Sequence, residues 1–343
     1  MSSVKGKLFE YFVYRMLLSC DFHPVSKDDL IIFKGQAGMM IQGLGQPHNA
    51  DVLVSPPIQI PFHYPTRLLI ECKCLEDAVG LPIIRNALGL REDINRFDIV
   101  TEEILKNRQK PGTKKKIYYD LQRYNYQVAV ASMNGFKVTA FPYAKTHRIP
   151  LISFRDNLIF EEIRNCIEWI EEEALKNKQV SEYILNFLKN SNHQLDCYCE
   201  SEYECFDIFM KAVHNLEIRI SIGVLEDGNI IFLYKEDNNL NENLERLNYE
   251  DGYSIYWSRK WKAWELRNET TKYLFELPKE IYDEWIKQED NKYIKALRIK
   301  QDYLSKIVLF DNINRKIRDK ECIKVLYISQ NFMNNARRQL ERD

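Results

Sequence analysis

The sequence predicts an α/β protein with two domains. Residues 1–150 are expected to form one α/β core, because apolar runs of strand length alternate there with helical periodicity. Residues 151–343 are expected to form an α+β accessory domain. In that part amphipathic helices come first, and the turn signal Asp227-Gly228 follows between two Ile-rich runs.

The elements of the first domain follow from the spacing of apolar residues. Three- and four-residue spacing predicts helices at residues 7–18 and 81–105, and Pro82 lies in a first turn, where a helix tolerates it. Apolar runs predict strands at residues 30–33, 51–54, 68–74, 127–131 and 137–141. Four prolines between residues 56 and 65 predict a loop. The Asn134-Gly135 pair predicts a tight turn that joins the last two strands as a hairpin.

The second domain shows a different pattern. Regularly spaced isoleucines and leucines predict two amphipathic helices between residues 163 and 188. The runs 218–222 and 230–234 predict an antiparallel hairpin around Asp227-Gly228. A second antiparallel pair is expected at residues 254–257 and 273–277, and helices rich in Lys and Glu are expected beyond it.

Composition excludes several classes of protein. The 343 residues are 45% hydrophobic and 29% charged, a balance typical of globular chains rather than disordered or fibrous ones. No apolar run reaches the ~18 residues that span a bilayer, and residues 1–8 lack the apolar core of a secretory signal. Eight cysteines are too few for a disulfide-stapled scaffold. We therefore expect a cytoplasmic protein without a membrane partner.

The formal net charge of −1 conceals an uneven distribution of charge. Residues 1–150 contain 20 Lys and Arg against 14 Asp and Glu, whereas residues 151–250 contain 9 against 21. A basic first block indicates contact with a polyanion in that part of the chain. The acidic block favours contact with another protein, although a solvated helix face would give the same count.

Three charged side chains fall on two of the predicted strands. Because side chains alternate along a strand, Glu71 and Lys73 project from one face, and Asp51 can lie beside Glu71 if the two strands are neighbours. A carboxylate and an ammonium on a strand of Leu, Ile and Cys are costly unless they have partners or a role. Two adjacent carboxylates repel each other. A hard divalent cation such as Mg²⁺ removes that conflict because it prefers oxygen ligands.

This arrangement resembles the PD-(D/E)xK nuclease superfamily, specifically its Mrr-like restriction-endonuclease branch. The resemblance rests on Gly6–Glu10 in the first helix, Asn49–Asp51 on one strand and Glu71–Lys73 on the next. It covers residues 1–150 and implies a restriction-endonuclease-like core, with a mixed central sheet flanked by helices. Ala50 stands where the family name has proline, and the proline-rich insertion before Glu71 is a larger departure from the pattern.

The resemblance implies a role for each matching residue. Asp51 and Glu71 would bind the metal, with the backbone carbonyl of Cys72 as a third oxygen ligand. Lys73 would orient the attacking water and stabilise charge on the phosphorane-like transition state, which suits its compact point charge. Glu10 would be an auxiliary catalytic carboxylate. Mg²⁺, for which Mn²⁺ would substitute, acidifies water and polarises phosphoryl oxygens, as phosphodiester hydrolysis requires.

Purely structural explanations remain open for the same residues. Glu71 and Lys73 would also fit a partly exposed ion pair on an edge strand, which contributes at most ~1 kcal/mol. Glu10 would also fit a solvated helix position. The thiols of Cys72 and Cys74 are of a type more often found as small core residues.

Further residues are candidates for DNA binding. A basic segment follows the second predicted helix, and it would contact phosphates unless it is a solvated loop. Its candidate residues are Lys110, Lys114, Lys115 and Lys116. Arg85 and Asn86, at the start of the preceding helix, would face the cleft.

Two other groups of residues carry weaker signals. One group has zinc-ligand residue types without the spacing of paired Cys-x₂-Cys knuckles; it consists of His193, Cys197, Cys199 and Cys205. The other would fit either a stacking surface for nucleic acid or, more simply, a half-buried aromatic hairpin; it consists of Trp257, Trp261 and Trp264.

The sequence therefore predicts a metal-dependent endonuclease that hydrolyses DNA, by resemblance a restriction or anti-phage defence effector. Residues 151–343 would dock a partner such as an ATPase or sensor subunit, mediate oligomerisation or recognise DNA. A homo-oligomer, dimeric or larger, is expected by analogy because cutting two strands requires two sites. Two alternatives remain: a catalytically silent module of the same fold that binds DNA or a partner protein, and an RNA-directed nuclease.

Overall fold

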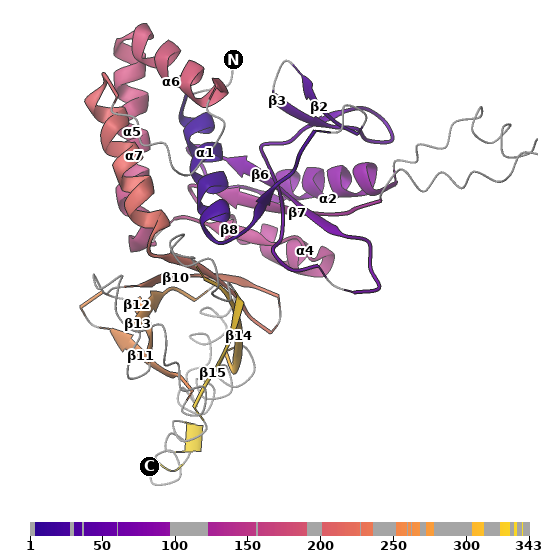
Figure 1. The fold of residues 1–343 in the computed structure, drawn as a ribbon, viewed down its shortest axis with the longest axis vertical. Helices are drawn as coiled ribbons and strands as arrows, with labels where there is room; N and C mark the ends of the chain where they lie inside the picture. The colour runs from indigo at the N-terminus through magenta and orange to yellow at the C-terminus, as the bar shows by residue number, and fades with distance from the viewer. Residues whose placement is uncertain are drawn as a thin grey trace, which may run out of the picture. The chain divides into compact units, whose positions relative to one another are not determined.

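The structure is a computed structural model, shown in Figure 1. It describes residues 4–27, 31–35, 38–59, 61–96, 123–155, 157–190, 201–226, 228–235, 252–258, 260–261, 263–267, 272–277, 304–311, 323–329, 333–334 and 338. The chain divides into two compact units, one formed by Phe22–Ser153 and the other by Met1–Asp21 with Phe154–Asp343. Within the described ranges, no helix is long and apolar enough to span a membrane.

A mixed five-stranded sheet forms the centre of the Phe22–Ser153 unit, in the order β1-β5-β6-β7-β8. Its strands are β1 (His23–Pro24), β5 (Val52–Ser55), β6 (Thr66–Lys73), β7 (Asn125–Ser132) and β8 (Leu151–Ser153). The pairs β1–β5 and β5–β6 are antiparallel, whereas β6–β7 and β7–β8 are parallel. The predicted mixed sheet is therefore confirmed, and three of its strands fall where apolar runs predict them.

Helices α2 (Leu81–Arg96) and α4 (Ala140–His147) pack on one face of this sheet. Leu53, Leu69 and Val128 from the strands share one buried cluster with Ile84 of α2 and Ala144 of α4. Each such Leu, Val or Ile side chain contributes about 1.5–3 kcal/mol when fully buried. Helix α2 is also the crossover that the parallel pair β6–β7 requires.

The strand predicted at residues 137–141 does not form, and this prediction is wrong. Asn134-Gly135 does turn the chain, with Gly135 at φ 70°, but helix α4 begins at Ala140 instead of a hairpin strand. The next strand, β8, runs parallel to β7. A parallel neighbour needs a crossover connection, and α4 provides it.

A small antiparallel sheet precedes β5 in the same unit. It consists of β2 (Ile32–Gly35), β3 (Gly38–Ile41) and β4 (His48–Asn49). Ile32 and Ile41 are fully buried in the cluster that also contains Leu69, so this sheet packs on the same core. The strand predicted at residues 30–33 thus exists but lies further along the chain.

The described part of the other unit contains the helices α1 (Val4–Ser19), α5 (Glu161–Lys176), α6 (Lys178–Asn190) and α7 (Glu204–Glu217). The short 3₁₀ helix η1 (Leu158–Phe160) leads into α5. Helix α1, which the sequence analysis places with residues 1–150, packs against α5, α6 and α7. The two amphipathic helices predicted between residues 163 and 188 are confirmed as α5 and α6.

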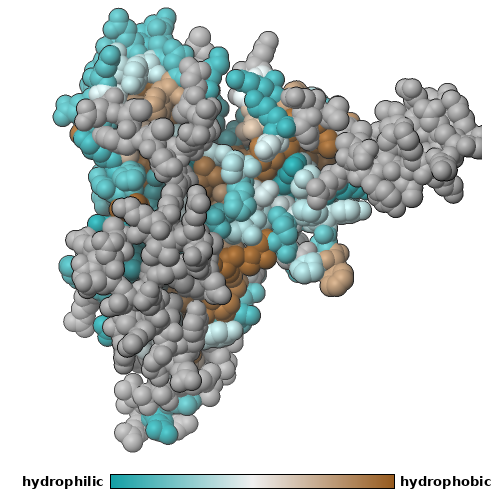
Figure 2. All heavy atoms as spheres, in the orientation of Figure 1, coloured by the Kyte–Doolittle hydropathy of each residue, from teal (hydrophilic) through white to brown (hydrophobic). Residues whose placement is uncertain are grey.

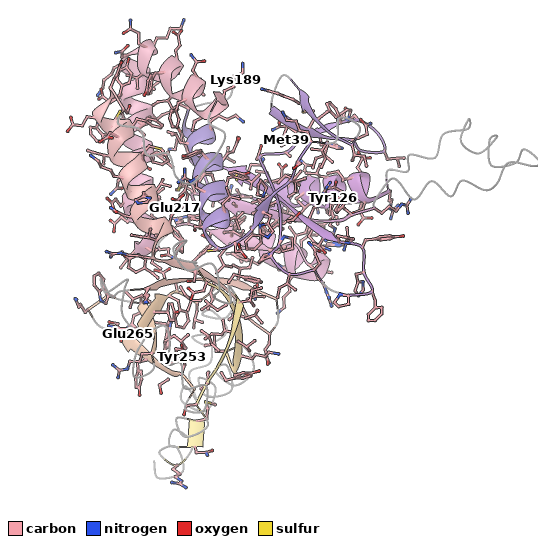
Figure 3. The ribbon with its side chains drawn as sticks, viewed as in Figure 1. Met39, Tyr126, Lys189, Glu217, Tyr253 and Glu265 are labelled. Atoms are coloured by element: carbon pink, nitrogen blue, oxygen red, sulfur yellow. The ribbon has the colours of Figure 1, made fainter. Side chains whose placement is uncertain are left out.

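A buried ion pair joins α1 to α7. The Arg15 guanidinium donates to both carboxylate oxygens of Glu217, over 2.5 and 2.8 Å, and to the Tyr11 hydroxyl over 2.9 Å. Glu217 is labelled in Figure 3. In contrast, the acidic residues of α5 mostly face outward, and hydrophilic side chains cover the outer side of these helices in Figure 2. Much of the acidic block is therefore a solvated helix face.

A seven-stranded antiparallel sheet completes this unit, in the order β11-β12-β13-β10-β9-β14-β15. Its strands are β9 (Ile220–Val224), β10 (Ile230–Lys235), β11 (Ser254–Ser258), β12 (Ala263–Arg267), β13 (Lys272–Phe275), β14 (Lys306–Phe310) and β15 (Ile323–Tyr327). The predicted β9–β10 hairpin is confirmed, and Gly228 adopts the positive φ of 86° that its turn requires. The second predicted pair is wrong, because β12 lies between β11 and β13. Toward the C-terminus, β14 and β15 are strands where helices are predicted.

The two outer strands of this sheet meet each other. Tyr253, just before β11, forms a parallel bridge with Ile328, just after β15. The Tyr253 N–H donates to the carbonyl of Tyr327 over 2.7 Å, and the Ser329 N–H donates to the carbonyl of Tyr253 over 2.9 Å. Gly252 makes this approach possible, since a Cβ at this position would lie 2.7 Å from the Ser329 backbone. The sheet therefore curls until its edges touch, which shields backbone groups that would otherwise be open to pairing.

Candidate active site

Asp51 and Glu71 face each other where the antiparallel strands β5 and β6 of the mixed sheet pair. The register of β5 and β6 pairs Val52 with Ile70 and Leu53 with Leu69. One residue further along, the same register places Asp51 opposite Glu71. Opposite residues of antiparallel strands project from the same face, so both carboxylates lie on the face of the buried Leu53 and Leu69.

Lys73 lies between the two carboxylates. Its Nζ is 2.8 Å from Glu71 Oε2 and 3.7 Å from Asp51 Oδ2. The side chains of Asp51, Glu71 and Lys73 are 13%, 19% and 25% exposed, respectively. The structure thus brings together the three residues at the centre of the sequence prediction, in a mostly buried cluster. A solvated ion pair on an edge strand does not describe them, because β6 is paired on both sides.

The orientation of Asp51 is fixed by two hydrogen bonds. The backbone N–H of Cys72 donates to Asp51 Oδ2 over 3.0 Å, and Asn49 Nδ2 donates to Asp51 Oδ1 over 3.1 Å. The first donor comes from β6 and the second from β4. Cys72 therefore contributes to the site through its backbone, while the thiols of Cys72 and Cys74 are half-buried rather than fully enclosed.

Electrostatics around the cluster follow from burial and proximity. Burial raises the pKa of the Glu71 carboxyl; the charge of Lys73 lowers it and that of Asp51 raises it, with a raised pKa as the net result. Burial lowers the pKa of Lys73, but the adjacent charge and hydrogen bond of Glu71 raise it, and the net pKa is raised. Lys73 is consequently an ammonium at neutral pH, and the cluster favours a further positive charge near its carboxylates.

The residues present fit a hard divalent cation. The side-chain donors on this face are carboxylate oxygens, which Mg²⁺ and Mn²⁺ prefer. Beside them, Asn49 Oδ1 is buried and has no hydrogen-bond partner among the described residues. Its amide cannot be turned around, because the Oδ1 atom would then face the carboxylate of Asp51. Mg²⁺ retains several of its waters, whose O–H groups could satisfy such an acceptor.

Among the described residues, no three His, Cys, Asp or Glu side chains are grouped so that they could hold a metal. Asp51 and Glu71 are thus two side-chain ligands, and the third oxygen expected from the sequence is the backbone carbonyl of Cys72. Waters would complete the shell of a hard cation.

The other predicted site residues belong to other elements or fall outside the described residues. Glu10 is on α1, in the other unit, where its carboxylate accepts a hydrogen bond from Lys7 Nζ over 2.6 Å. Arg85 and Asn86 are exposed on α2, and the Arg85 guanidinium lies 5.7 Å from the centroid of the Tyr143 ring. Lys110, Lys114, Lys115 and Lys116 lie outside the described residues.

The weaker sequence signals have structural explanations where the structure describes them. Cys205 is buried in α7, and the remaining zinc-type residues fall outside the described ranges. Trp257 and Trp264 are cross-strand partners of β11 and β12, with ring centroids 5.3 Å apart in an edge-to-face contact. They form the aromatic hairpin that the sequence analysis considers the simpler explanation.

Two residues that bear on the cluster have no role in the sequence prediction. Asn49 belongs to the motif on which the resemblance rests, but no role is assigned to it there. Asp93, on α2, accepts a hydrogen bond from Gly45 N–H and lies 2.5 Å from His48 Nε2. No local pattern links Asp93 to residues 45–48, because the contact spans more than forty positions in the chain.

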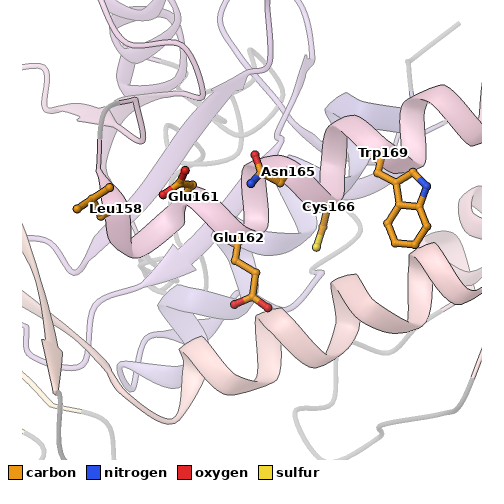
Figure 4. A pocket seen from close by; sticks show the side chains of 6 residues that line it. All are labelled: Leu158, Glu161, Glu162, Asn165, Cys166 and Trp169. Atoms are coloured by element: carbon orange, nitrogen blue, oxygen red, sulfur yellow. The ribbon is translucent and has the colours of Figure 1, made fainter. Parts of the chain in front are cut away.

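A separate hollow lies on η1 and α5, away from these residues in sequence. It is lined by Leu158, Glu161, Glu162, Asn165, Cys166 and Trp169, as Figure 4 shows. None of the predicted site residues lines it.

Comparison with known proteins gives little further information. No family model and no curated protein matches the sequence. Among solved structures, the chain is similar to the crystal structure of a protein of unknown function, AF1548. The two share 12% sequence identity, with a TM-score of 0.30, over 61% of this chain and 97% of the other. A similarity at this level supports no conclusion about fold or function.

Proposed function

We propose that this protein is a metal-dependent endonuclease that hydrolyses phosphodiester bonds of DNA at Asp51, Glu71 and Lys73. The observation that carries the proposal is the position of Lys73 Nζ, 2.8 Å from Glu71 and 3.7 Å from Asp51 on one face of two adjoining strands. A mostly buried set of two carboxylates and one ammonium is costly to maintain for stability alone, and such clusters are typical of functional sites.

Each of the three residues has a distinct task in this reaction. Asp51 and Glu71 would hold Mg²⁺, with the carbonyl of Cys72. When bound, the cation supplies an acidified water and polarises the phosphoryl oxygens. Lys73, held protonated by its neighbours, presents a point charge that stabilises the negative charge developing on the phosphate. The hydrogen bonds of Cys72 and Asn49 to Asp51 keep that carboxylate oriented before substrate arrives.

Several features of the wider function belong to the same proposal. Residues 1–150 contain more basic than acidic residues, which suits a polyanionic substrate. By the family resemblance, the protein would act as a cytoplasmic restriction or anti-phage defence effector and would function as a dimer or larger oligomer. Residues 151–343 would dock a partner such as an ATPase or sensor subunit, because their acidic helix surface is unsuited to gripping DNA.

Plasmid cleavage in Mg²⁺ or Mn²⁺ tests the proposal. We expect the wild-type chain to nick or linearise supercoiled DNA, and Glu71→Gln and Lys73→Met to lose this activity. Glu173 and Lys176 provide matched controls, because they form an ion pair of similar length, 2.9 Å, on the surface of α5. Glu173→Gln and Lys176→Met should cut like the wild type.

Two results would contradict the proposal in different ways. Cleavage that survives both Glu71→Gln and Lys73→Met would show that the assigned site is wrong. No cleavage of DNA by any form, with either cation and with candidate partner proteins present, would instead favour a silent binding module. Cleavage of RNA but not DNA by the same residues would retain the site and change the substrate.

A further inference from the structure

The short strand β4, His48–Asn49, is anchored to helix α2 through Asp93. His48 Nε2 lies 2.5 Å from Asp93 Oδ2, and the Gly45 N–H donates to Asp93 Oδ1 over 3.0 Å. The backbone carbonyl of Asp93 accepts a further hydrogen bond from the Leu44 N–H over 3.1 Å. One carboxylate and one carbonyl thus hold both ends of the loop that leads into β4.

This anchoring depends on close packing that only glycine permits at residue 43. A Cβ at Gly43 would lie 2.1 Å from Asp93 Oδ2, 2.7 Å from the carbonyl oxygen of Gln46 and 2.9 Å from the His48 ring. Real side chains do not approach backbone oxygens this closely, so the loop backbone at Gln46 would have to shift, and the Asp93 carboxylate with it. The loop conformation is therefore specific, and it determines where β4 lies relative to α2.

Strand β4, anchored in this way, places the side chain of Asn49 next to Asp51. Asn49 pairs with Met40 in the small sheet, and its Nδ2 donates to Asp51 Oδ1 over 3.1 Å. Asp51 Oδ2 is held from the opposite side by the Cys72 N–H. Each oxygen of the Asp51 carboxylate thus accepts a hydrogen bond from a different sheet, and together the two bonds fix the orientation of this carboxylate.

We propose that Asn49 is a positioning residue of the nuclease site, which holds Asp51 ready for a divalent cation, and that Asp93 supports it by anchoring β4. This inference rests on the proposed function. A carboxylate that becomes ordered only when the cation binds has a lower affinity for the cation than a carboxylate that is already held in place. The reason is that the entropy lost in ordering the side chain reduces the binding free energy. Hydrogen-bonded neighbours of metal ligands typically account for 10- to 100-fold in affinity or activity.

Mn²⁺ binding to the full chain, measured by isothermal titration calorimetry after removal of bound metal, tests this inference. We expect Asn49→Ala to weaken Mn²⁺ binding about 10- to 100-fold. Its plasmid cleavage should require correspondingly more Mn²⁺ but recover at high concentration, because the ligands themselves remain. Asp93→Ala, which leaves Asn49 and both carboxylates intact, should shift Mn²⁺ binding in the same direction by a smaller factor.

Asn95 on α2 provides the matched structural control. Its side chain makes two hydrogen bonds of 2.8 Å to the backbone of Tyr126 and is not bonded to Asp51. Asn95→Ala should lower the melting temperature while leaving Mn²⁺ affinity unchanged, whereas Asn49→Ala should change the affinity. A merely structural asparagine at residue 49 would behave like Asn95.

The outcomes separate this inference from the proposed function. If the wild type binds Mn²⁺ and cuts DNA while Asn49→Ala binds Mn²⁺ equally well, the positioning role is wrong and the nuclease proposal stands. If the wild type neither binds Mn²⁺ nor cuts, both are wrong. Should Asn49→Ala fail to fold, Asp93→Ala decides, and an unchanged Mn²⁺ affinity in that variant would overturn the inference.

Discussion

Replacing Lys73 by methionine is the most informative single perturbation of the cluster. The change keeps most of the side chain's apolar length but removes an ammonium that lies 2.8 Å from Glu71 and 3.7 Å from Asp51. A hydrogen bond to a charged group contributes about 1.5–3 kcal/mol, and its loss here leaves two mostly buried carboxylates facing each other. We therefore expect the free energy of unfolding to fall by about 2 kcal/mol at pH 7. This corresponds to a melting temperature lower by roughly 4–8 °C.

The raised pKa of Glu71 sets the sign of the pH dependence. Burial raises this pKa and Lys73 opposes the effect, so removing Lys73 raises the pKa of Glu71 further. Above the folded-state pKa the charged carboxylate destabilises the fold, and this penalty disappears as the pH falls and Glu71 takes up a proton. The stability difference between Lys73→Met and the wild type should therefore be greatest above neutral pH and shrink in mild acid.

Thermal unfolding followed by circular dichroism, with and without Mg²⁺, measures both effects. Mg²⁺ should restore part of the lost stability, because the cation replaces the missing positive charge between the carboxylates. Cleavage should nevertheless remain about 10²- to 10³-fold below wild type, as is typical when a group that stabilises transition-state charge is removed. Lys176→Met is the control, since Lys176 is 66% exposed and its pair with Glu173 contributes little.

One pattern of results would refute this reasoning. If Lys73→Met lost the same stability at every pH, and if Mg²⁺ had no effect on it, then the charge of Glu71 would not be the cause of the loss. The two carboxylates would then share no cation site.

Three further predictions concern other parts of the chain. In wild type, Mg²⁺ at 100 times its dissociation constant should stabilise the fold by about 2.7 kcal/mol in a thermal melt, and Asp51→Asn should abolish this shift. Gly43→Ala should destabilise the fold because its Cβ would collide with Asp93, whereas Gly89→Ala, with no atom within 4 Å, should stabilise helix α2 by roughly 0.5–1 kcal/mol in a denaturant titration. Arg15→Met should cost about 3–5 kcal/mol because the buried carboxylate of Glu217 loses the guanidinium that neutralises its charge. The double variant Arg15→Met, Glu217→Leu should recover most of that loss; if a double-mutant cycle showed no recovery, the pair itself would stabilise the fold.

The residues of the cluster could be predicted because strands have a period of two. Glu71 and Lys73 are two apart on an apolar strand, so they share a face, and Asp51 can lie beside Glu71 once its strand is the neighbour of that strand. The sequence could not indicate Asp93, because its contact with His48 is set by how α2 lies against a different sheet. Such a contact depends on packing between elements and leaves no local pattern.

Errors in the secondary structure have equally specific causes. Residues 137–141 have the composition of a strand, but the need for a crossover to β8 imposes a helix on the residues that follow. Helix α7 is not among the predicted elements, although Phe206, Phe209 and Val213 have helical spacing. Strand β12 is not predicted either, because the run Ala263–Arg267 contains a charge, Glu265, that the folded sheet buries beside Lys272.

The bridge between Tyr253 and Ile328 has a consequence for how the sheet of seven strands folds during synthesis. Strand β14 pairs with β9, but the contact between the end of β15 and the start of β11 requires residues 327–329. The sheet can therefore be completed only after these residues have been synthesised. Until then β11 and β14 each offer an uncovered edge, which is the state in which nascent β proteins associate with one another. A chain that ends shortly before residue 323 would retain every residue of the Phe22–Ser153 unit. It would nevertheless be prone to aggregate during synthesis.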